Sequence, residues 1–212
     1  MQSNTARKKL LFIGTGGTIA SELSEGALSP ALGAEQLLRL VPDVSRMCDA
    51  DAVQLFELDS TDIMPEHWIR IADEIIRRYD DYDGFVIAHG TDTMAYTASA
   101  LSYLIQNSRK PIVLTGAQKP IGFETTDSKQ NLSDSFLCAA SGMAGVLVVF
   151  GGQVLLGIRA RKTRSKSFSA FSSPNYPPLA TVQNGRMALY FDPTEGETHF
   201  CRSLDPSVGL LK

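Results

Sequence analysis

Cysteine is scarce in this sequence, and long apolar runs are missing. The 212 residues include only Cys48, Cys138 and Cys201, which are widely spaced and odd in number. This pattern argues against a disulfide framework or a cysteine-based metal site and favours buried or spare thiols in a reducing compartment. No segment approaches the roughly 18 apolar residues of a membrane helix, and residues 10–13 are too short for the apolar core of a signal peptide. We therefore expect a cytoplasmic protein without a membrane partner.

An excess of one charge sign is also lacking. The formal net charge is −3, with 43% hydrophobic and 20% charged residues, which is ordinary for a soluble globular enzyme. This balance gives no general attraction to nucleic acid. One basic cluster, RARKTRSK, occupies residues 159–166. It is either a solvated loop or a loop from which one lysine turns inward, where burial lowers the lysine pKa and lets it act as a base for a hydroxyl.

Apolar segments alternate with helical patterns up to residue 150. Strands are expected at residues 9–13, 52–58, 84–89, 111–115 and 146–150. Helices are expected from Pro65, over residues 94–105 and over residues 128–140. The first helix shows one apolar face at helical spacing, made of Trp68, Ile71, Ala72, Ile75, Ile76 and Tyr79. The second has almost no charge, so we expect it to be buried on most sides. The order predicts an α/β fold, a mainly parallel sheet with helices on both faces.

Beyond residue 150 the pattern changes to short strands and turns. Gly151-Gly152-Gln153 predicts a hairpin turn, and Asn184-Gly185 predicts a type I′ turn. Residues 165–178 are rich in serine, proline and aromatic residues and predict a long ordered loop. Residues 208–212 resemble the beginning of a strand. We therefore expect C-terminal β-hairpins added to the parallel sheet.

The segment LLFIGTGGTIA, residues 10–20, runs from an apolar strand into a glycine-rich turn. Gly14, Gly16 and Gly17 let a ligand approach the backbone, and Thr18 is the reactive group of the turn. The same glycines resemble a dinucleotide-binding fingerprint. Two features count against a cofactor: no helix pattern follows Ala20 at once, and no acidic strand end appears about 20 residues further on.

Hydroxyl and carboxylate side chains also follow the next two strands. Asp59-Ser60-Thr61-Asp62 precedes the Pro65 helix, and Thr91-Asp92 precedes the helix at residue 94. Each of these two groups alone is explained by helix capping. Three hydroxyl-bearing loops after three successive strands favour one site, because open α/β sheets bind ligands at the carboxyl ends of their strands. Without a cysteine–histidine cluster, these groups suit a small zwitterionic substrate and hydrolysis without a metal. His89 is expected to be a packed residue and not a general base.

Taken together, these residues resemble the bacterial-type L-asparaginases, in particular the cytoplasmic type I branch. The motifs that carry the resemblance cover nearly the whole chain in the family's order: GTGGTIA (14–20), DSTDI (59–63), HGTDTMAYTA (89–98), PIVLTGAQKP (111–120), DSKQNLSDS (127–135) and residues 157–176. The joint match is far more specific than any single motif. It implies the N-terminal domain of the asparaginase fold and an amidohydrolase acting on asparagine, with glutamine as a further possible substrate.

The resemblance implies catalytic roles for four residues. Thr18 would attack the side-chain amide, Lys162 would lower the cost of deprotonating Thr91, and Asp92 would hold the substrate's α-ammonium. It implies substrate binding by Gly17, Asp59, Ser60, Thr61, Gly90 and Ala117. Of these, residues 59–61 would bind the α-amino and α-carboxylate groups, and Ala117 would offer its carbonyl near the leaving amide. The implied reaction is double displacement through a β-aspartyl ester, with no cofactor and no metal.

The resemblance also implies a division of the chain. Residues 1–192 would be the N-terminal catalytic domain, and residues 193–212 a linker with the first strand of a smaller C-terminal domain. In the family that domain completes the site of a neighbouring subunit, so we expect a homo-oligomer, a dimer or tetramer, for the full-length protein. Residues 21–30 lack the tyrosine that many members carry there. Either another group supplies the proton relay or activity is reduced.

Two other functions stay open at this point. The chain also looks like the amidohydrolase component of archaeal glutamyl-tRNA amidotransferases, although the N-terminal extension of that component is not seen before the first strand. A catalytically silent asparagine-binding module would keep the same hydroxyl-lined pocket. Ammonia release from asparagine separates an enzyme from a sensor, and stimulation by a charged tRNA would identify the transferase component.

Overall fold

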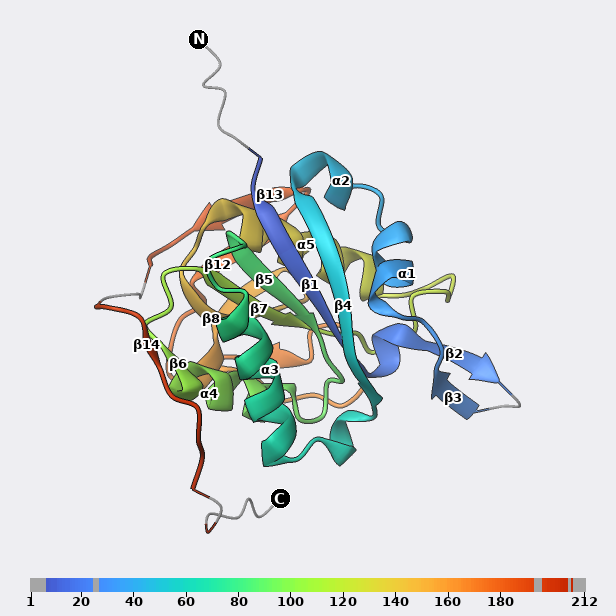
Figure 1. The fold of residues 1–212 in the computed structure, drawn as a ribbon. Coiled ribbons are helices and arrows are strands. Elements are labelled where there is room, and N and C mark those ends of the chain that lie inside the picture. Colours follow the sequence, from blue (N-terminus) through green and yellow to red (C-terminus); the bar gives the residue numbers. More distant parts are fainter. Residues whose placement is uncertain (1–6, 25–26, 193–195, 206, 208–212) are drawn as a thin grey trace.

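The computed structural model describes residues 7–24, 27–192, 196–205 and 207. Its centre is an eight-stranded sheet in the order β13-β12-β9-β8-β7-β5-β1-β4 (Figure 1). Five neighbouring strands are parallel: β1 (Lys9–Gly16), β4 (Asp49–Leu58), β5 (Gly84–Ala88), β7 (Pro111–Thr115) and β8 (Gly145–Phe150). The other three are antiparallel: β9 (Gln153–Leu156), β12 (Ala180–Gln183) and β13 (Arg186–Leu189). The predicted α/β class and the predicted mainly parallel sheet are confirmed.

The first strand is longer than the sequence pattern predicted. The apolar run ends at Ile13, but β1 continues through Gly14 and pairs with β4 as far as Gly16. A register shift between Gly14 and Gly16 marks an irregularity in this ladder. The turn therefore begins at Gly17 and not at Gly14.

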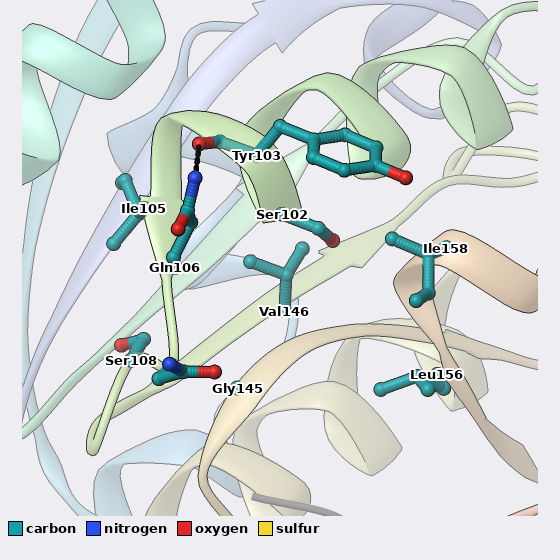
Figure 2. A pocket seen from close by; sticks show the side chains of 10 residues that line it. Ser102, Tyr103, Ile105, Gln106, Ser108, Gly145, Val146, Leu156 and Ile158 are labelled. Carbon is teal, nitrogen blue, oxygen red and sulfur yellow. Dashed lines mark hydrogen bonds between the residues drawn. The ribbon is translucent and has the colours of Figure 1, made fainter. Parts of the chain in front are cut away.

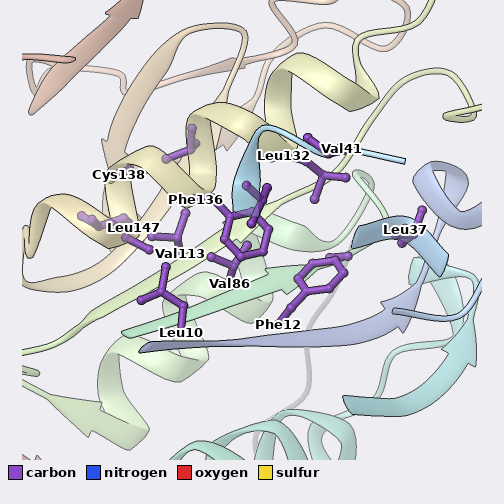
Figure 3. Close-up of a cluster of buried hydrophobic side chains, with 14 of the residues drawn as sticks. Leu10, Phe12, Leu37, Val41, Val86, Val113, Leu132, Phe136, Cys138 and Leu147 are labelled. Atoms are coloured by element: carbon purple, nitrogen blue, oxygen red, sulfur yellow. The ribbon is translucent and has the colours of Figure 1, made fainter. Parts of the chain in front are cut away.

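Side chains of the central strands alternate between two cores, one on each face of the sheet. Leu10 and Phe12 face α1 (Ala34–Arg39), α2 (Val44–Met47) and α5 (Ser128–Ser141) in the first core (Figure 3). Leu11 and Ile13 face α3 (Pro65–Arg77) and α4 (Met94–Leu104) in the second. In Figure 1, α3 lies in front of the sheet and α5 behind it. Helices on both faces are thus confirmed, because a strand buried on both sides needs a cover on each.

The three predicted helices are present. In α3, Pro65 occupies the first turn, and Ile71, Ala72 and Ile75 form its buried face. The expectation of burial on most sides is only partly met by α4, since Tyr103 is 64% exposed. The last predicted helix, α5, ends at Gly142, whose φ of 79° is the left-handed cap that glycine accepts at low cost.

Both predicted hairpin turns are confirmed. Gly151 and Gly152 join β8 to β9, and Asn184 and Gly185 have φ values of 52° and 69°, as a type I′ turn requires. The predicted loop at residues 165–178 contains a short strand, β11 (Phe171–Ser172), which pairs with β10 (Arg161–Lys162).

Two more small pairings were not predicted from the sequence. One joins β2 (Ser21–Ser24) to β3 (Ala27–Pro30), directly after the glycine turn. The other joins β6 (Ile105–Gln106) to β14 (His199–Phe200). The expected strand at residues 208–212 lies outside the described residues. Among the helices that the structure describes, none has the length and apolarity to cross a membrane.

Candidate active site

Four loops meet at the carboxyl ends of the parallel strands. They follow β1 at Gly17, β4 at Asp59, β5 at His89 and β7 at Gly116. In a parallel sheet these ends lie on the same edge, and ligands of open α/β sheets bind there. The predicted site residues of the first half of the chain therefore share one edge of the sheet.

Gly17 and Gly90 are the points at which these loops touch. A Cβ atom on Gly17 would lie 2.5 Å from the Cα of Gly90, and one on Gly90 would lie 2.6 Å from the Cβ of Ser60. Gly17 also has a φ of 82°, which favours glycine. No side chain fits at either position. Because Gly17 precedes Thr18 and Gly90 precedes Thr91, the two threonines start from backbones in direct contact.

A lysine from a distant segment completes a three-residue cluster on this edge. The Nζ of Lys162 donates hydrogen bonds to the Oγ1 of Thr91 at 2.8 Å and to the Oδ1 of Asp92 at 2.7 Å. The side chain of Lys162 is 16% exposed, and that of Asp92 is 61% exposed. Thr91 is buried. The cluster thus reaches from the protein interior to the surface.

The basic segment at residues 159–166 is a loop from which one lysine turns inward. Lys162 lies in β10 and turns toward Thr91, whereas its neighbours Arg161 and Arg164 are exposed. Pairing of β10 with β11 fixes the segment, and Ala170 accepts backbone hydrogen bonds from the two residues that follow Lys162. Lys162 therefore faces inward, while the other charged residues of the basic segment, Arg159, Arg161, Arg164 and Lys166, are exposed.

Thr18 lies differently. It begins a short 3-10 helix, η1 (Thr18–Ala20), and is partly exposed. Its hydroxyl makes no hydrogen bond with the part of the chain that the structure describes. A dinucleotide-binding turn needs its glycines in the turn and a long helix directly after it, whose N-terminus receives the pyrophosphate. Here Gly14 and Gly16 lie in β1, and only a three-residue helix follows. The structure therefore does not support the dinucleotide interpretation.

Neither group of residues caps the long helix that follows it, and Asp59 instead caps a short 3-10 helix. Asp59 accepts hydrogen bonds from the backbone N–H and hydroxyl of Thr61 at 2.8 and 2.7 Å, which begins η2 (Ser60–Asp62) and lowers the pKa of the Asp59 carboxyl. Helix α4, by contrast, begins after Thr93. Thr91 and Asp92 are therefore not its caps, and their hydrogen bonds go to Lys162.

Residues Ser60 and Ala117 reach the same edge through their backbones. The Ser60 carbonyl accepts a hydrogen bond from the hydroxyl of Thr93 at 2.6 Å, which ties the β4 loop to the β5 loop. Ala117 is buried in the β7 loop. A Cβ on Gly116 would lie 2.3 Å from the carbonyl oxygen of His89, so the β7 and β5 loops also touch.

His89 takes part in a hydrogen-bond chain that the sequence did not reveal. The indole N–H of Trp68 donates to Thr97 at 3.0 Å, Thr97 pairs with His89 Nε2 at 2.9 Å, and His89 Nδ1 pairs with the Gly90 carbonyl at 2.7 Å. The Gly90 carbonyl can only accept, so Nδ1 of His89 carries a proton. Full burial lowers the pKa of His89 to about 4. The predicted packed role of His89 is confirmed, and the chain fixes the loop that carries Thr91.

Two cavities share Ile158 in their lining, and only one of them adjoins the cluster. A cavity of about 680 Å³ is lined by Asp92, Tyr96, Arg159 and Lys162 among others. A second, of about 370 Å³, lies near the amino end of β8, beside Tyr103, Val146 and Ile158 (Figure 2). No charged side chain lines this second cavity. The first cavity therefore adjoins the groups capable of chemistry.

The open parallel sheet and the hydroxyl, carboxylate and lysine groups at its edge define the class: an α/β domain with a site assembled from successive strand ends. The chain belongs to the asparaginase family. The family model described as "Asparaginase, N-terminal" matches residues 9–195.

The L-asparaginase of Thermococcus kodakarensis is 41% identical to this chain over 204 residues, which cover 94% of this chain and 62% of that protein. The solved structure of the thermostable L-asparaginase from Thermococcus kodakarensis matches with a TM-score of 0.87 at 40% identity, over 93% of this chain and 61% of that one. The probable cytoplasmic L-asparaginase from Campylobacter jejuni matches with a TM-score of 0.80 at 32% identity, over 88% and 58%.

A component of the glutamyl-tRNA(Gln) amidotransferase of Pyrococcus abyssi is also similar, at 36% identity over 219 residues, which cover 96% of this chain and 50% of that protein. The chain thus spans between 50% and 62% of the length of these two sequence relatives.

Proposed function

We propose that this chain supplies the N-terminal catalytic domain of an L-asparagine amidohydrolase, which releases ammonia and leaves aspartate. Residues 1–192 form this domain, and residues 193–212 lead into a further one. The observation that carries the proposal is the contact of one lysine with both a threonine and an aspartate, at 2.8 and 2.7 Å, beside a second threonine loop. Family membership and 41% identity to an L-asparaginase support the choice of reaction.

Lys162 acts on Thr91 through its charge. At 2.8 Å and an effective dielectric constant of about 20, a unit positive charge favours the deprotonated hydroxyl by roughly 6 kcal/mol before solvation costs. Asp92 holds the ammonium in place through its Oδ1 atom. The exposed remainder of the Asp92 carboxylate is free to accept the α-ammonium group of an amino-acid substrate.

Thr18 is the nucleophile. In the first half of the reaction its oxygen bonds to the amide carbon of asparagine, the C–N bond breaks, and the hydroxyl proton leaves with ammonia. In the second half water attacks the β-aspartyl ester, returns a proton to the Thr18 oxygen and releases aspartate. The Thr91–Lys162 pair carries the proton relay. In many members of the family this role belongs to a tyrosine in the loop that corresponds to residues 21–30 of this chain.

The remaining predicted residues bind the substrate. Asp59, Ser60 and Thr61 recognise its α-amino and α-carboxylate groups, and the hydrogen bonds from Thr61 that lower the pKa of Asp59 also hold that carboxylate in place. Gly17 and Gly90 let their loops pack against each other and contribute backbone groups to the substrate site. Ala117 offers its carbonyl to the leaving amide.

An amidotransferase role is the second candidate. The similarity to the Pyrococcus abyssi glutamyl-tRNA(Gln) amidotransferase component over 96% of this chain supports it. In that case the same residues would free ammonia for transfer to tRNA-bound glutamate. The higher identity to L-asparaginase, 41% against 36%, favours the hydrolase.

A homo-oligomer in the cytoplasm is the expected setting. Asp92 is 61% exposed and adjoins a cavity that Tyr96 and Ile158 also line, which leaves room for a second copy of the protein to cover the site. The three thiols, two of them buried, are compatible with a reducing compartment. Light scattering on the chain, alone and extended by the C-terminal portion found in its relatives, tests the assembly.

The decisive experiment is ammonia release from L-asparagine. The purified chain, and the same chain extended as above, are assayed beside Thr91→Val. We expect turnover by the extended chain and none by the variant. Binding of asparagine without ammonia release by either protein would instead indicate a non-catalytic binding module. Ammonia release that requires a glutamyl-tRNA would indicate the transferase component.

A further inference from the structure

Asp127 and Asn131, in the motif DSKQNLSDS, have no role in the proposed function. Both are nearly inaccessible, with 6% and 1% exposure, although one is charged and the other polar. Asp127 stands at the N-cap of α5, yet its side chain makes no capping hydrogen bond to that helix. An N-cap aspartate normally accepts a bond from the first turn of its own helix. The carboxylate must therefore serve another part of the molecule.

The partners of both side chains lie in the β7 loop, on either side of Ala117. Asp127 accepts hydrogen bonds from the backbone N–H of Gln118 at 3.0 Å and of Lys119 at 3.1 Å. Asn131 donates from Nδ2 to the Gly116 carbonyl at 2.9 Å. The two side chains are also joined to each other at 3.2 Å. Thus the carbonyl before Ala117 and the N–H after it are both held.

Asp127 and Asn131 together form a clamp on the β7 loop. Because the peptide group is planar, this clamp fixes the direction of the Ala117 carbonyl. The Ala117 carbonyl and the Gln118 N–H belong to one trans peptide, in which the two groups point in opposite directions. Since the N–H points at Asp127, the carbonyl points away from α5. No hydrogen bond engages this carbonyl within the described residues. Asn131 also accepts the Gly151 N–H at 3.0 Å, which anchors the clamp to the turn after β8.

We propose that Asp127 and Asn131 are positioning residues that aim the Ala117 carbonyl at the N–H groups of the substrate's side-chain amide. This inference rests on the proposed function. The two residues do not touch the substrate. They hold one acceptor at the angle that the leaving ammonia requires, and a displacement of about 1 Å in such an acceptor costs about a hundredfold in rate.

An ester substrate separates positioning from general support of the fold. L-Aspartate β-methyl ester has the same acyl group as asparagine but no amide N–H, so the Ala117 carbonyl has nothing to accept from it. Asp127→Asn keeps the shape of the side chain and loses one acceptor. We expect kcat for asparagine to fall about ten- to a hundredfold, while kcat for the ester changes by less than about threefold.

Asp134→Asn is the matched control, because Asp134 is a buried aspartate of the same helix that bonds to Gln130 and not to the β7 loop. It should leave the ratio of the two rates unchanged. Asn131→Ala is the second variant and should shift the ratio in the same direction as Asp127→Asn. Equal losses on both substrates, or failure of both variants to fold, would make the pair structural and overturn the inference. If the extended parent chain hydrolyses neither substrate, the proposed function itself fails.

Discussion

The two threonine loops of the site differ in how completely they are built. On the Thr91 side, which comprises Thr91, Asp92 and Lys162, each side chain has a hydrogen-bond partner in the cluster. His89 supports this side through its hydrogen bond to the Gly90 carbonyl, which directly precedes Thr91. On the Thr18 side, which comprises Gly17 and η1, the threonine hydroxyl has no partner among the described residues. The strands β2 and β3 that follow it project beyond the sheet (Figure 1).

This difference matches the division of labour that we propose. A group that stabilises charge works best when its dipoles and charges are fixed before the substrate arrives. A nucleophile, in contrast, must exchange its partner for the substrate carbon, and an existing hydrogen bond would have to be broken first. The Thr91 side is thus the finished side and the Thr18 side is the open side. The two are suited to successive tasks in one reaction.

The largest expected effect breaks the finished side. Lys162→Met removes the charge beside Thr91 and should lower turnover of asparagine by at least about a thousandfold, or roughly 4 kcal/mol in the barrier. Arg161→Met is the control, because it removes a charge from the adjacent, exposed position. Ammonia release by the extended chain measures both. A loss of less than about tenfold in Lys162→Met would contradict the role of the cluster.

Acid should destabilise the whole chain through His89, which supports the Thr91 side. The pKa of His89 is lowered to about 4 by burial, whereas an unfolded histidine titrates near 6.5. The unfolded chain therefore binds the proton first, and stability falls as the pH drops from about 6.5 to about 4, by about 3 kcal/mol in all. Above this window the contribution is complete, and below it no further change follows.

The measurement is denaturant unfolding of the parent and of His89→Gln across pH 4 to 7. Asp134 has a pKa raised to about 6 by burial and acts in the opposite direction over part of this range. The difference between the two proteins isolates His89, since both retain Asp134. A difference that stays constant with pH would show that His89 is not held neutral.

Ligand binding tests whether the carboxyl-end edge of the sheet, with both threonine loops, binds an amino acid or a dinucleotide. L-Aspartate at about 100 times its Kd should raise the free energy of unfolding by about 2.7 kcal/mol, and NAD should raise it not at all. Asp92→Asn should lose much of the shift with aspartate, because it removes the acceptor proposed for the α-ammonium. Thermal shift measurements test both. Stabilisation by NAD alone would contradict an amino-acid site.

The sequence predicted the parallel part of the sheet well, because β1, β5, β7 and β8 are buried on both faces and read as apolar runs. It failed where structure depends on pairing with distant residues. The extension of β1 to Gly16 requires β4, and β10 and β11 exist only as partners of each other. The helices α1 and α2 are six and four residues long, too short for a clear periodic pattern.

For the site, strand ends could be predicted and the inward lysine could not. Thr91 and Asp92 follow an apolar strand directly, so their edge of the sheet was predictable. The choice of Lys162 over Arg161 depends on the register of β10 against β11, because alternate residues of a strand face opposite ways. The resemblance to the family supplied that choice. Nothing in the sequence links Trp68, Thr97 and His89, which come from two helices and a strand end.

The smallest expected effect compares the two threonines by stability alone. Thr91→Val leaves the Lys162 ammonium with Asp92 as its remaining cluster partner and should lower the free energy of unfolding by about 1–2 kcal/mol. Thr18→Val removes a partly exposed hydroxyl that has no partner in the described chain, so its effect should stay within about 0.5 kcal/mol. Both variants should be inactive, which separates function from stability. Urea unfolding of the two variants beside the parent gives the numbers. Equal stability losses would mean that the Thr18 hydroxyl is also engaged before substrate binds, and the contrast between a finished and an open side would no longer hold.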